Sequence, residues 1–241
     1  MSHRKVGEAL WEEKHSITKL EKQRARAPRE FNALYQQRPV IEGGNIVKRD
    51  WFRRISFAEF KALRFNEPMH FYLDTAYNKK KNKGHENDPS GILAACRIGT
   101  NIYLYDAMQV WKEMPDLLRF LPEYMAAHEG NRESKLNIEP KANGISVVQM
   151  LKEITTLNVK ETPTPTDDKE VRLRVVSPRI ECGRVFLVEG SWIDDFLDEV
   201  CGFPAMEHDE FVDILGYAIN DLYEEDDDID YDNLDKSSLG L

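Results

Sequence analysis

One short segment, Met69-His70-Phe71-Tyr72-Leu73-Asp74, carries the pattern from which the architecture of this chain follows. Its apolar run is short and ends in an acid, which indicates a buried strand. In open α/β sheets, functional sites collect at the edge where such strands end. The segment therefore predicts both a sheet and a first candidate site residue, Asp74.

The segments that follow extend the same sheet. Residues 91–98 and 102–107 are apolar runs joined by a Gly-Thr-Asn link, which predicts an antiparallel hairpin. Further strands are expected over residues 136–139 and 184–188. Helices are expected over residues 115–127, 145–155, 192–199 and 207–222, and residues 171–179 fit a helix or a strand. This order predicts a mixed α/β sheet flanked by helices.

Three regions are expected along the chain: an N-terminal helix and linker over residues 1–50, one large domain over residues 51–223, and an acidic, disordered tail over residues 224–241. The helix spans residues 8–26 in this reading. The compact part is expected to begin at Met69, and the segment that includes Trp51-Phe52 is expected to lie across a domain surface, outside the core.

Composition excludes several classes of protein. No run of 18 apolar residues exists, so no membrane span is encoded, and the basic N-terminus lacks the apolar stretch of a signal peptide. The three cysteines have no zinc spacing, and no nucleotide-binding glycine loop is present. The net charge of −10 does not exclude DNA, because eight acidic residues gather between residues 224 and 235 while basic runs lie elsewhere.

Acids recur at structurally similar positions. Glu139 closes its strand as Asp74 does, and in the last predicted helix Asp209 and Asp213 stand four residues apart, on one face. Gly216 is expected to permit close helix–sheet approach. Carboxylates from separate strands and one helix suit Mg²⁺ or Mn²⁺, and two such ions can cleave a phosphodiester. The residues alone leave a second reading open, because acids at strand ends and helix starts are commonly just solvated.

Taken in chain order, several segments resemble the C-terminal nuclease domain of tailed-bacteriophage terminase large subunits, the DNA-packaging motors. The resemblance covers roughly residues 31–223. The matching segments are Tyr35-Gln36-Gln37-Arg38-Pro39 with Gly43-Gly44 and Trp51, Phe71-Tyr72-Leu73-Asp74-Thr75-Ala76, Asn137-Ile138-Glu139-Pro140-Lys141-Ala142-Asn143-Gly144, Asp168-Lys169 with Arg172, Pro178, Glu181 and Gly183-Arg184-Val185, and Phe203-Pro204 with His208-Asp209-Glu210-Phe211-Val212-Asp213.

The resemblance implies a ribonuclease-H-like fold and two-metal cleavage of concatemeric double-stranded DNA into genome lengths. It implies Mg²⁺ or Mn²⁺ as cofactor, held by Asp74, Glu139 and Asp213, with Asp209 as the second choice for the third ligand. Implied partners are DNA, the terminase ATPase domain, the small terminase subunit and the portal protein, in the cytoplasm of a bacterial host. Residues expected to contact DNA phosphates are Lys79, Lys80, Lys81, Lys141, Lys169 and Arg172.

The last segment departs from the family pattern, which more often reads His-Asp-Asp. Glu210 holds the second acidic place here, and Ile214 follows Asp213 instead of alanine. The choice among Asp209, Glu210 and Asp213 therefore stays open. Two other functions also stay open: another ribonuclease-H-like nuclease, such as a junction resolvase, and a catalytically inactive docking domain of the packaging machine.

Overall fold

The computed structural model describes residues 16, 19–20, 46–75, 89–139, 143–163, 167–206 and 208–224. The chain divides into two compact units, residues 1–45 and residues 46–241. In the first unit only residues 16, 19 and 20 are described, so most of the predicted helix over residues 8–26 lies outside the described residues. The acidic tail after residue 224 lies outside them as well. The second unit contains the sheet and the candidate site.

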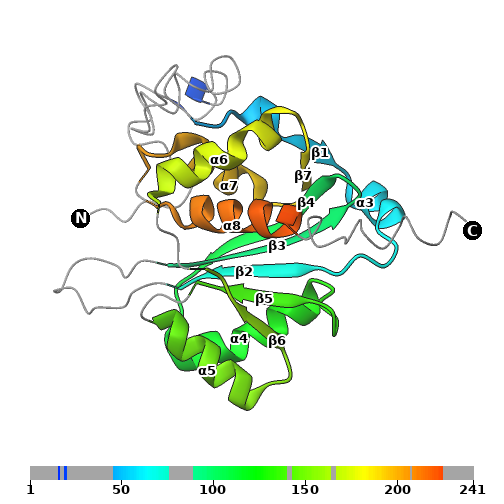
Figure 1. The fold of residues 1–241 in the computed structure, drawn as a ribbon. Helices are drawn as coiled ribbons and strands as arrows, with labels where there is room; N and C mark the ends of the chain where they lie inside the picture. The colour runs from blue at the N-terminus through cyan, green and yellow to red at the C-terminus, as the bar shows by residue number, and fades with distance from the viewer. Residues whose placement is uncertain are drawn as a thin grey trace, which may run out of the picture. The chain divides into compact units, whose positions relative to one another are not determined.

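A seven-stranded mixed sheet forms the centre of the second unit, in the order β1-β7-β4-β3-β2-β5-β6 (Figure 1). The strands are β1 (Arg53–Ile55), β2 (His70–Asp74), β3 (Ser90–Ile98), β4 (Asn101–Val110), β5 (Lys135–Ile138), β6 (Asn158–Glu161) and β7 (Val185–Val188). β3 is antiparallel to both of its neighbours, and the other pairs are parallel. All strands except β3 therefore end at the same edge of the sheet.

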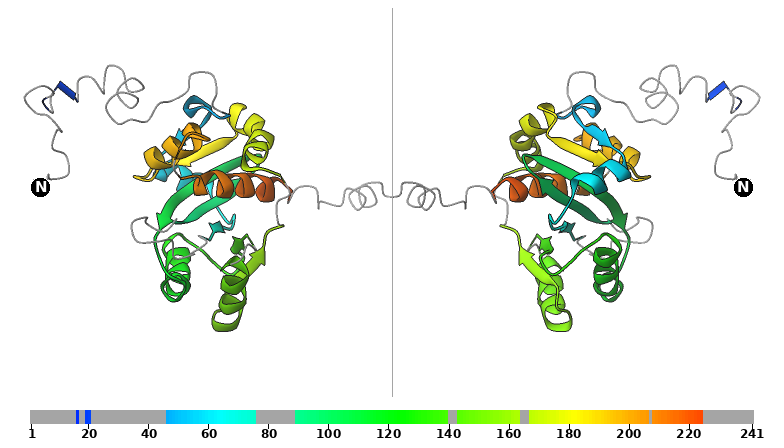
Figure 2. Two further views of the ribbon diagram at one scale, coloured as in Figure 1. Left: turned by 90° about the vertical axis from the view of Figure 1, so that its left-hand side faces the viewer. Right: turned by 90° about the vertical axis from the view of Figure 1, so that its right-hand side faces the viewer.

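Helices cover both faces of this sheet. They are α3 (Phe57–Leu63), α4 (Met114–Ala127), α5 (Asn143–Ile154), α6 (Lys169–Glu181), α7 (Ile193–Gly202) and α8 (Glu210–Glu224), with a 3-10 turn at Arg49–Trp51. Figures 1 and 2 show α6, α7 and α8 on one face, and α4 and α5 on the other. The sheet is thus the middle of three layers, which confirms the predicted mixed sheet flanked by helices.

The strand residues alternate between two hydrophobic clusters. In β2, Tyr72 belongs to the cluster built by α6, α7 and α8, whereas Phe71 and Leu73 belong to the cluster built by α3, α4 and α5. Side chains of successive strand residues point to opposite faces, so a strand that is covered on both sides needs an unbroken apolar run. This is why β2 and β3 are apolar along nearly their whole length.

The structure confirms most of the predicted elements. The hairpin is β3–β4, which is antiparallel with an irregularity between Ala94 and Ala95. The fourth strand is β5, and Glu139 follows it directly. The segment that fitted either a helix or a strand is helical and forms α6. β6 was not predicted, because a single one of its four residues, Val159, is buried and the others are exposed.

The expectation that the compact part begins at Met69 was wrong. β1 extends the sheet beside β7, and Val47, Phe52 and Phe60 are buried in the core. The expectation that the segment through Phe52 lies outside the core was wrong for the same reason. β1 carries two exposed arginines in three residues and pairs along one side only, so its sequence has no strand pattern to detect.

A glycine does allow close approach of α8 to the sheet, but it is Gly91 of β3. A Cβ atom added at Gly91 would lie 2.9 Å from the Cβ of Glu210. Gly216 was predicted to have this role, but a Cβ there would lie more than 4 Å from every atom apart from its chain neighbours and its own helix backbone, so that prediction was wrong. The close contact lies at the start of α8, one turn before Asp213.

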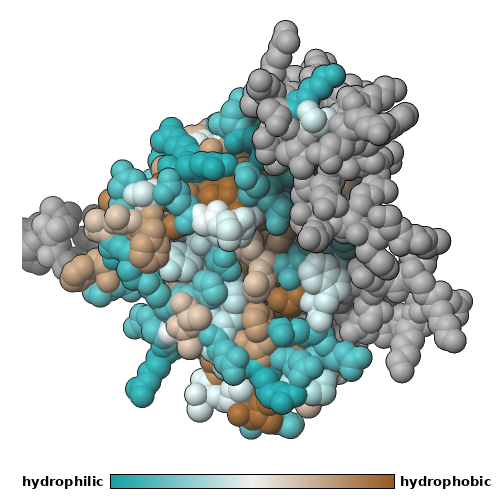
Figure 3. Space-filling model, turned by 180° about the vertical axis from the view of Figure 1, so that it is seen from behind, coloured by the Kyte–Doolittle hydropathy of each residue, from teal (hydrophilic) through white to brown (hydrophobic). Residues whose placement is uncertain are grey.

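No helix in the described ranges has the length and apolar character needed to cross a membrane. The face seen in Figure 3 carries hydrophilic and hydrophobic side chains interspersed over the described residues. Exposed large hydrophobic residues, among them Phe65, Trp111 and Ile154, come from different parts of the fold.

Candidate metal centre

Two of the predicted acids lie side by side because of strand register. β2 and β5 are parallel, and Leu73 pairs with Ile138. The next residue on each strand is an acid, Asp74 or Glu139, and the Glu139 N–H donates to the Leu73 carbonyl oxygen over 3.4 Å. The two carboxylates therefore leave adjacent strands at the same edge of the sheet.

The third acid, Asp213, comes from α8, which packs across the face of β2 and β3. Its neighbours Phe211, Ile214 and Leu215 are buried in the core, and their packing fixes the orientation of the helix about its axis. Asp213 is 1% exposed, although it is charged and lies on a helix. A carboxylate is almost never buried to this extent unless it is paired or binds a cation.

Asp74, Glu139 and Asp213 meet at this edge, and each offers an oxygen atom within 4.8 Å of the others. Glu139 is 1% exposed, like Asp213, whereas Asp74 is partly exposed. Three carboxylates are the hard oxygen donors that Mg²⁺ and Mn²⁺ prefer. The donor set thus fits the cofactor that the sequence predicted.

Neither Asp209 nor Glu210 belongs to this group of three acids in the part of the chain that the structure describes. α8 begins at Glu210, so Asp209 directly precedes the helix that carries Asp213. Its Oδ1 lies 2.6 Å from the Lys169 Nζ. Glu210 instead accepts a hydrogen bond of 3.2 Å from the Gln109 side-chain amide.

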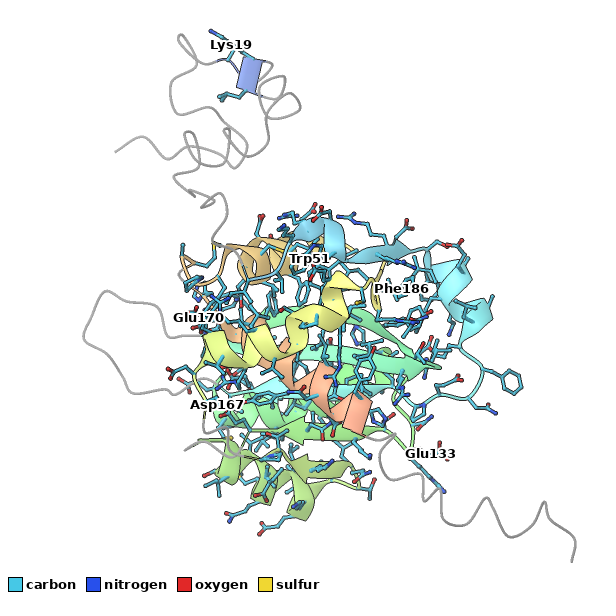
Figure 4. The ribbon with its side chains drawn as sticks, turned by 45° about the horizontal axis from the view of Figure 1, so that its top comes forward. Lys19, Trp51, Glu133, Asp167, Glu170 and Phe186 are labelled. Atoms are coloured by element: carbon cyan, nitrogen blue, oxygen red, sulfur yellow. The ribbon has the colours of Figure 1, made fainter. Side chains whose placement is uncertain are left out.

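Two cations from α6 contact the buried aspartate. The Lys169 Nζ lies 2.8 Å from the Asp213 Oδ2, and the Arg172 guanidinium bonds the Asp213 Oδ1. Burial alone lowers the pKa of Lys169, but the carboxylates of Asp213 and Asp209 raise it above its ordinary value. Asp167 and Glu170, labelled in Figure 4, mark the start of α6 where these cations lie. The predicted DNA contacts Lys169 and Arg172 are thus ion-paired with acids here.

A tyrosine lies next to the acids and Arg172. Burial, with the nearby Glu139 carboxylate, raises the pKa of Tyr217 above its ordinary value. The Arg172 guanidinium carbon lies 5.8 Å from the centre of the Tyr217 ring. Tyr217 is therefore a neutral group that lies near both Arg172 and Glu139.

A second buried acid supports the start of α8. Glu199, at the end of α7, is 4% exposed, and its carboxylate accepts hydrogen bonds from the Phe211 N–H and from the Gln109 side-chain amide. Burial raises the pKa of Glu199 to about 8, and the bond from Phe211 opposes that rise. Sequence reasoning missed this residue, because an acid within an amphipathic helix is ordinarily exposed.

Four of the predicted DNA contacts, Lys79, Lys80, Lys81 and Lys141, lie outside the described residues. The described part of the site consequently consists of the three meeting carboxylates, the Lys169 and Arg172 pair, and the supports provided by Tyr217 and Glu199.

Comparison with known proteins identifies the family. The family described as "Terminase RNaseH-like domain" matches residues 72–222, which is more than half of the chain. The chain belongs to the terminase RNaseH-like domain family. The matched region includes Asp74, Glu139, Asp209 and Asp213. No curated protein matches the sequence.

Solved structures of terminases are similar to this chain at low sequence identity. The large terminase of a thermophilic bacteriophage is 10% identical with a TM-score of 0.50, and the match covers 74% of this chain and 44% of that one. The large terminase nuclease domain of bacteriophage SPP1 with bound Mn is 13% identical with a TM-score of 0.49, covering 75% and 99%. The human cytomegalovirus terminase nuclease domain is 12% identical with a TM-score of 0.48, covering 72% and 94%. The match to the thermophilic phage terminase shows the same ribonuclease-H-like fold.

Proposed function

We propose that this member of the terminase RNaseH-like family is a divalent-metal-dependent endonuclease domain that cuts concatemeric double-stranded viral DNA during genome packaging. The observation that carries the proposal is the meeting of Asp74, Glu139 and Asp213 at one edge of the sheet, inside the region that matches the family. Two buried carboxylates beside a partly exposed one suit a cation that must also reach a substrate.

Asp74, Glu139 and Asp213 would hold the divalent ions. A bound pair of Mg²⁺ or Mn²⁺ ions supplies positive charge to the scissile phosphate and lowers the pKa of the attacking water. The chain's own contribution is to hold three acids in place: strand register fixes Asp74 beside Glu139, and the packing of α8 fixes Asp213 opposite them. A rigid set of ligands favours catalysis, because it needs no reorganisation when the substrate arrives.

Basic residues near the acids are proposed to bind the DNA backbone. Lys169 and Arg172 start α6 next to the acids. The further proposed contacts are Lys79, Lys80, Lys81 and Lys141. Contacts to phosphates position a duplex without reading its sequence, so we expect cutting with little sequence preference.

The proposal extends to the setting of the enzyme. The domain would act in the cytoplasm of a bacterial host, joined to or working with a terminase ATPase domain, the small terminase subunit and the portal protein. Asp209 is proposed as a residue near the acids that does not itself bind metal, because the three acids whose oxygen atoms lie within 4.8 Å of one another are Asp74, Glu139 and Asp213.

The test is cleavage of supercoiled plasmid by the full chain in Mn²⁺, with Asp74→Asn as the variant. Asn keeps the size of the side chain but removes the charge, and we expect the cleavage rate to fall by about 100-fold or more. Asp195→Asn, on the exposed side of α7, is the matched control and should cut like the wild type. Circular dichroism spectra and melting temperatures would establish that both variants are folded.

Unimpaired cleavage by a folded Asp74→Asn protein would refute the assignment. A four-way junction should be included as a second substrate, because a strong preference for it over linear duplex would favour a resolvase. A folded wild-type chain that binds no Mn²⁺ in calorimetry would point to an inactive docking domain.

A further inference from the structure

The buried carboxylate of Asp213 is ion-paired with a cation at each oxygen. The Lys169 Nζ lies 2.8 Å from its Oδ2, and the Arg172 guanidinium bonds its Oδ1. The Lys169 Nζ also lies 2.6 Å from the Asp209 Oδ1. One lysine thus joins the acid of the metal centre to an acid just outside it.

The two cations differ in how firmly they are held. Arg172 also donates a hydrogen bond of 2.6 Å to the Asp167 carbonyl oxygen, and its side chain is 15% exposed. The Lys169 side chain is 31% exposed and stands at the first residue of α6. A lysine ammonium on its flexible stem moves more easily than a guanidinium in a fixed fork of bonds. Lys169 is consequently the cation that can leave.

We propose that Lys169 is a resident counter-ion of the metal centre, which holds the Asp213 Oδ2 in the metal-free protein and is displaced from it when a divalent ion binds. This inference rests on the proposed function, since it assumes that Asp213 is a metal ligand. Lys169 and a divalent ion cannot both occupy the position 2.8 Å from that oxygen. Metal binding therefore competes with an ion pair already present.

Asp209 has a defined role in this arrangement. Its contact with Lys169 keeps the ammonium beside the site after the Asp213 Oδ2 is released. The released ammonium can then bond a phosphate of the DNA, as lysines commonly do. Lys169 is thus a positioning residue that links metal binding to contact with the DNA backbone.

The test is a calorimetric titration of Mn²⁺ into the full, DNA-free chain, comparing the wild type with Lys169→Gln, Lys169→Arg and Lys160→Gln. Lys169→Gln removes the competing cation while Arg172 still pairs with Asp213, so we expect the Kd for Mn²⁺ to fall by about tenfold, the effect of one largely buried ion pair. Lys169→Arg keeps a cation there and should bind Mn²⁺ no more tightly than the wild type.

Lys160→Gln is the matched control. Lys160 pairs with Asp221, its Nζ lying 3.1 Å from the Oδ1. Asp221 lies eight residues beyond Asp213 on α8, about 12 Å along the helix. This variant removes the same charge from the chain but leaves the Asp213 contact, so its Kd should stay within about twofold of the wild type.

Melting temperatures give a second measurement. Without metal, Lys169→Gln should melt lower than the wild type, because the buried Asp213 loses one of its partners. Addition of Mn²⁺ should then raise its melting temperature by more than that of the wild type.

The outcomes separate this inference from the proposed function. If wild-type protein binds Mn²⁺ and cuts DNA but Lys169→Gln binds Mn²⁺ no more tightly than Lys160→Gln does, the counter-ion role is wrong and the nuclease proposal stands. Weaker Mn²⁺ binding by Lys169→Gln would also overturn it. A wild-type chain that binds no Mn²⁺ would overturn both.

Discussion

Replacing Glu199 by glutamine should stabilise the protein progressively as the pH rises. Glu199 supports the start of α8 through the Phe211 N–H, and its pKa is raised from 4.5 to about 8 by burial. A raised pKa means that the folded state binds one more proton than the unfolded state between these two values. The contribution of Glu199 to stability is therefore complete below pH 4.5 and is lost as the pH rises through about 8.

The size of the effect follows from the pKa difference. Within this window one extra proton changes the free energy of unfolding by about 1.4 kcal/mol per pH unit. From pH 5.5 to 7.5 the wild type should lose roughly 2–3 kcal/mol through this group. Glutamine carries no charge in either state, and its amide oxygen can accept the same hydrogen bond from Phe211.

The assay is urea unfolding of the wild type and Glu199→Gln in EDTA at several pH values between 5.5 and 7.5. The difference in unfolding free energy should grow in favour of the variant as the pH rises. Glu170→Gln, at an exposed position of α6, is the control and should give a curve parallel to the wild type. Parallel curves for Glu199→Gln as well would refute the reasoning, because they would mean that Glu199 is ionised in the folded protein.

Three further predictions concern packing, metal binding and pH. In urea unfolding, Gly91→Ala should destabilise the protein by about 1–3 kcal/mol, because its new Cβ overpacks the start of α8. Gly216→Ala has open space around the new Cβ and should stabilise the protein by up to about 1 kcal/mol. Equal effects of the two substitutions would contradict this packing. Asp209→Asn should leave the calorimetric Kd for Mn²⁺ within about threefold of the wild type, whereas Asp213→Asn should raise it by at least about tenfold. If both substitutions raised the Kd equally, Asp209 would be a metal ligand. Hydrogen bonds and a nearby carboxylate outweigh burial and raise the pKa of His128. The contribution of His128 to stability should therefore be complete below pH 6.5 and be lost as the pH rises through the raised pKa. If His128→Gln left the shape of the melting temperature against pH unchanged, this prediction would be wrong.

Sequence patterns predicted the strands that carry the acids because burial on both faces leaves a clear signal. β2 and β5 are buried along nearly their whole length; β2 ends at Asp74, and Glu139 directly follows β5. β1 and β6 lie at the two edges of the sheet and are mostly exposed, so their residues are free to be polar and carry no such signal. Edge strands are therefore the part of this fold that sequence reasoning misses.

The third acid shows a different limit. The spacing of Asp209 and Asp213 suggested one helical face. Lys169 does contact both carboxylates, but α8 begins after Asp209. Helix boundaries depend on tertiary contacts, here those of Glu199 and Gly91 with the first turn. The contacts of Lys169 with two acids likewise depend on how α6 packs against α8, which no local pattern encodes.

The position of Asp213 on α8 has a consequence for the time at which the site forms. Asp74, Glu139 and Asp213 are spread over 140 residues, and α8 follows every other described element in the chain. A chain emerging from the ribosome has its first two acids long before the third, so the set stays incomplete until α8 docks on the sheet. Under the proposed function, a nascent or partly folded copy would be harmless to the DNA around it, and cleavage would begin only with the finished domain.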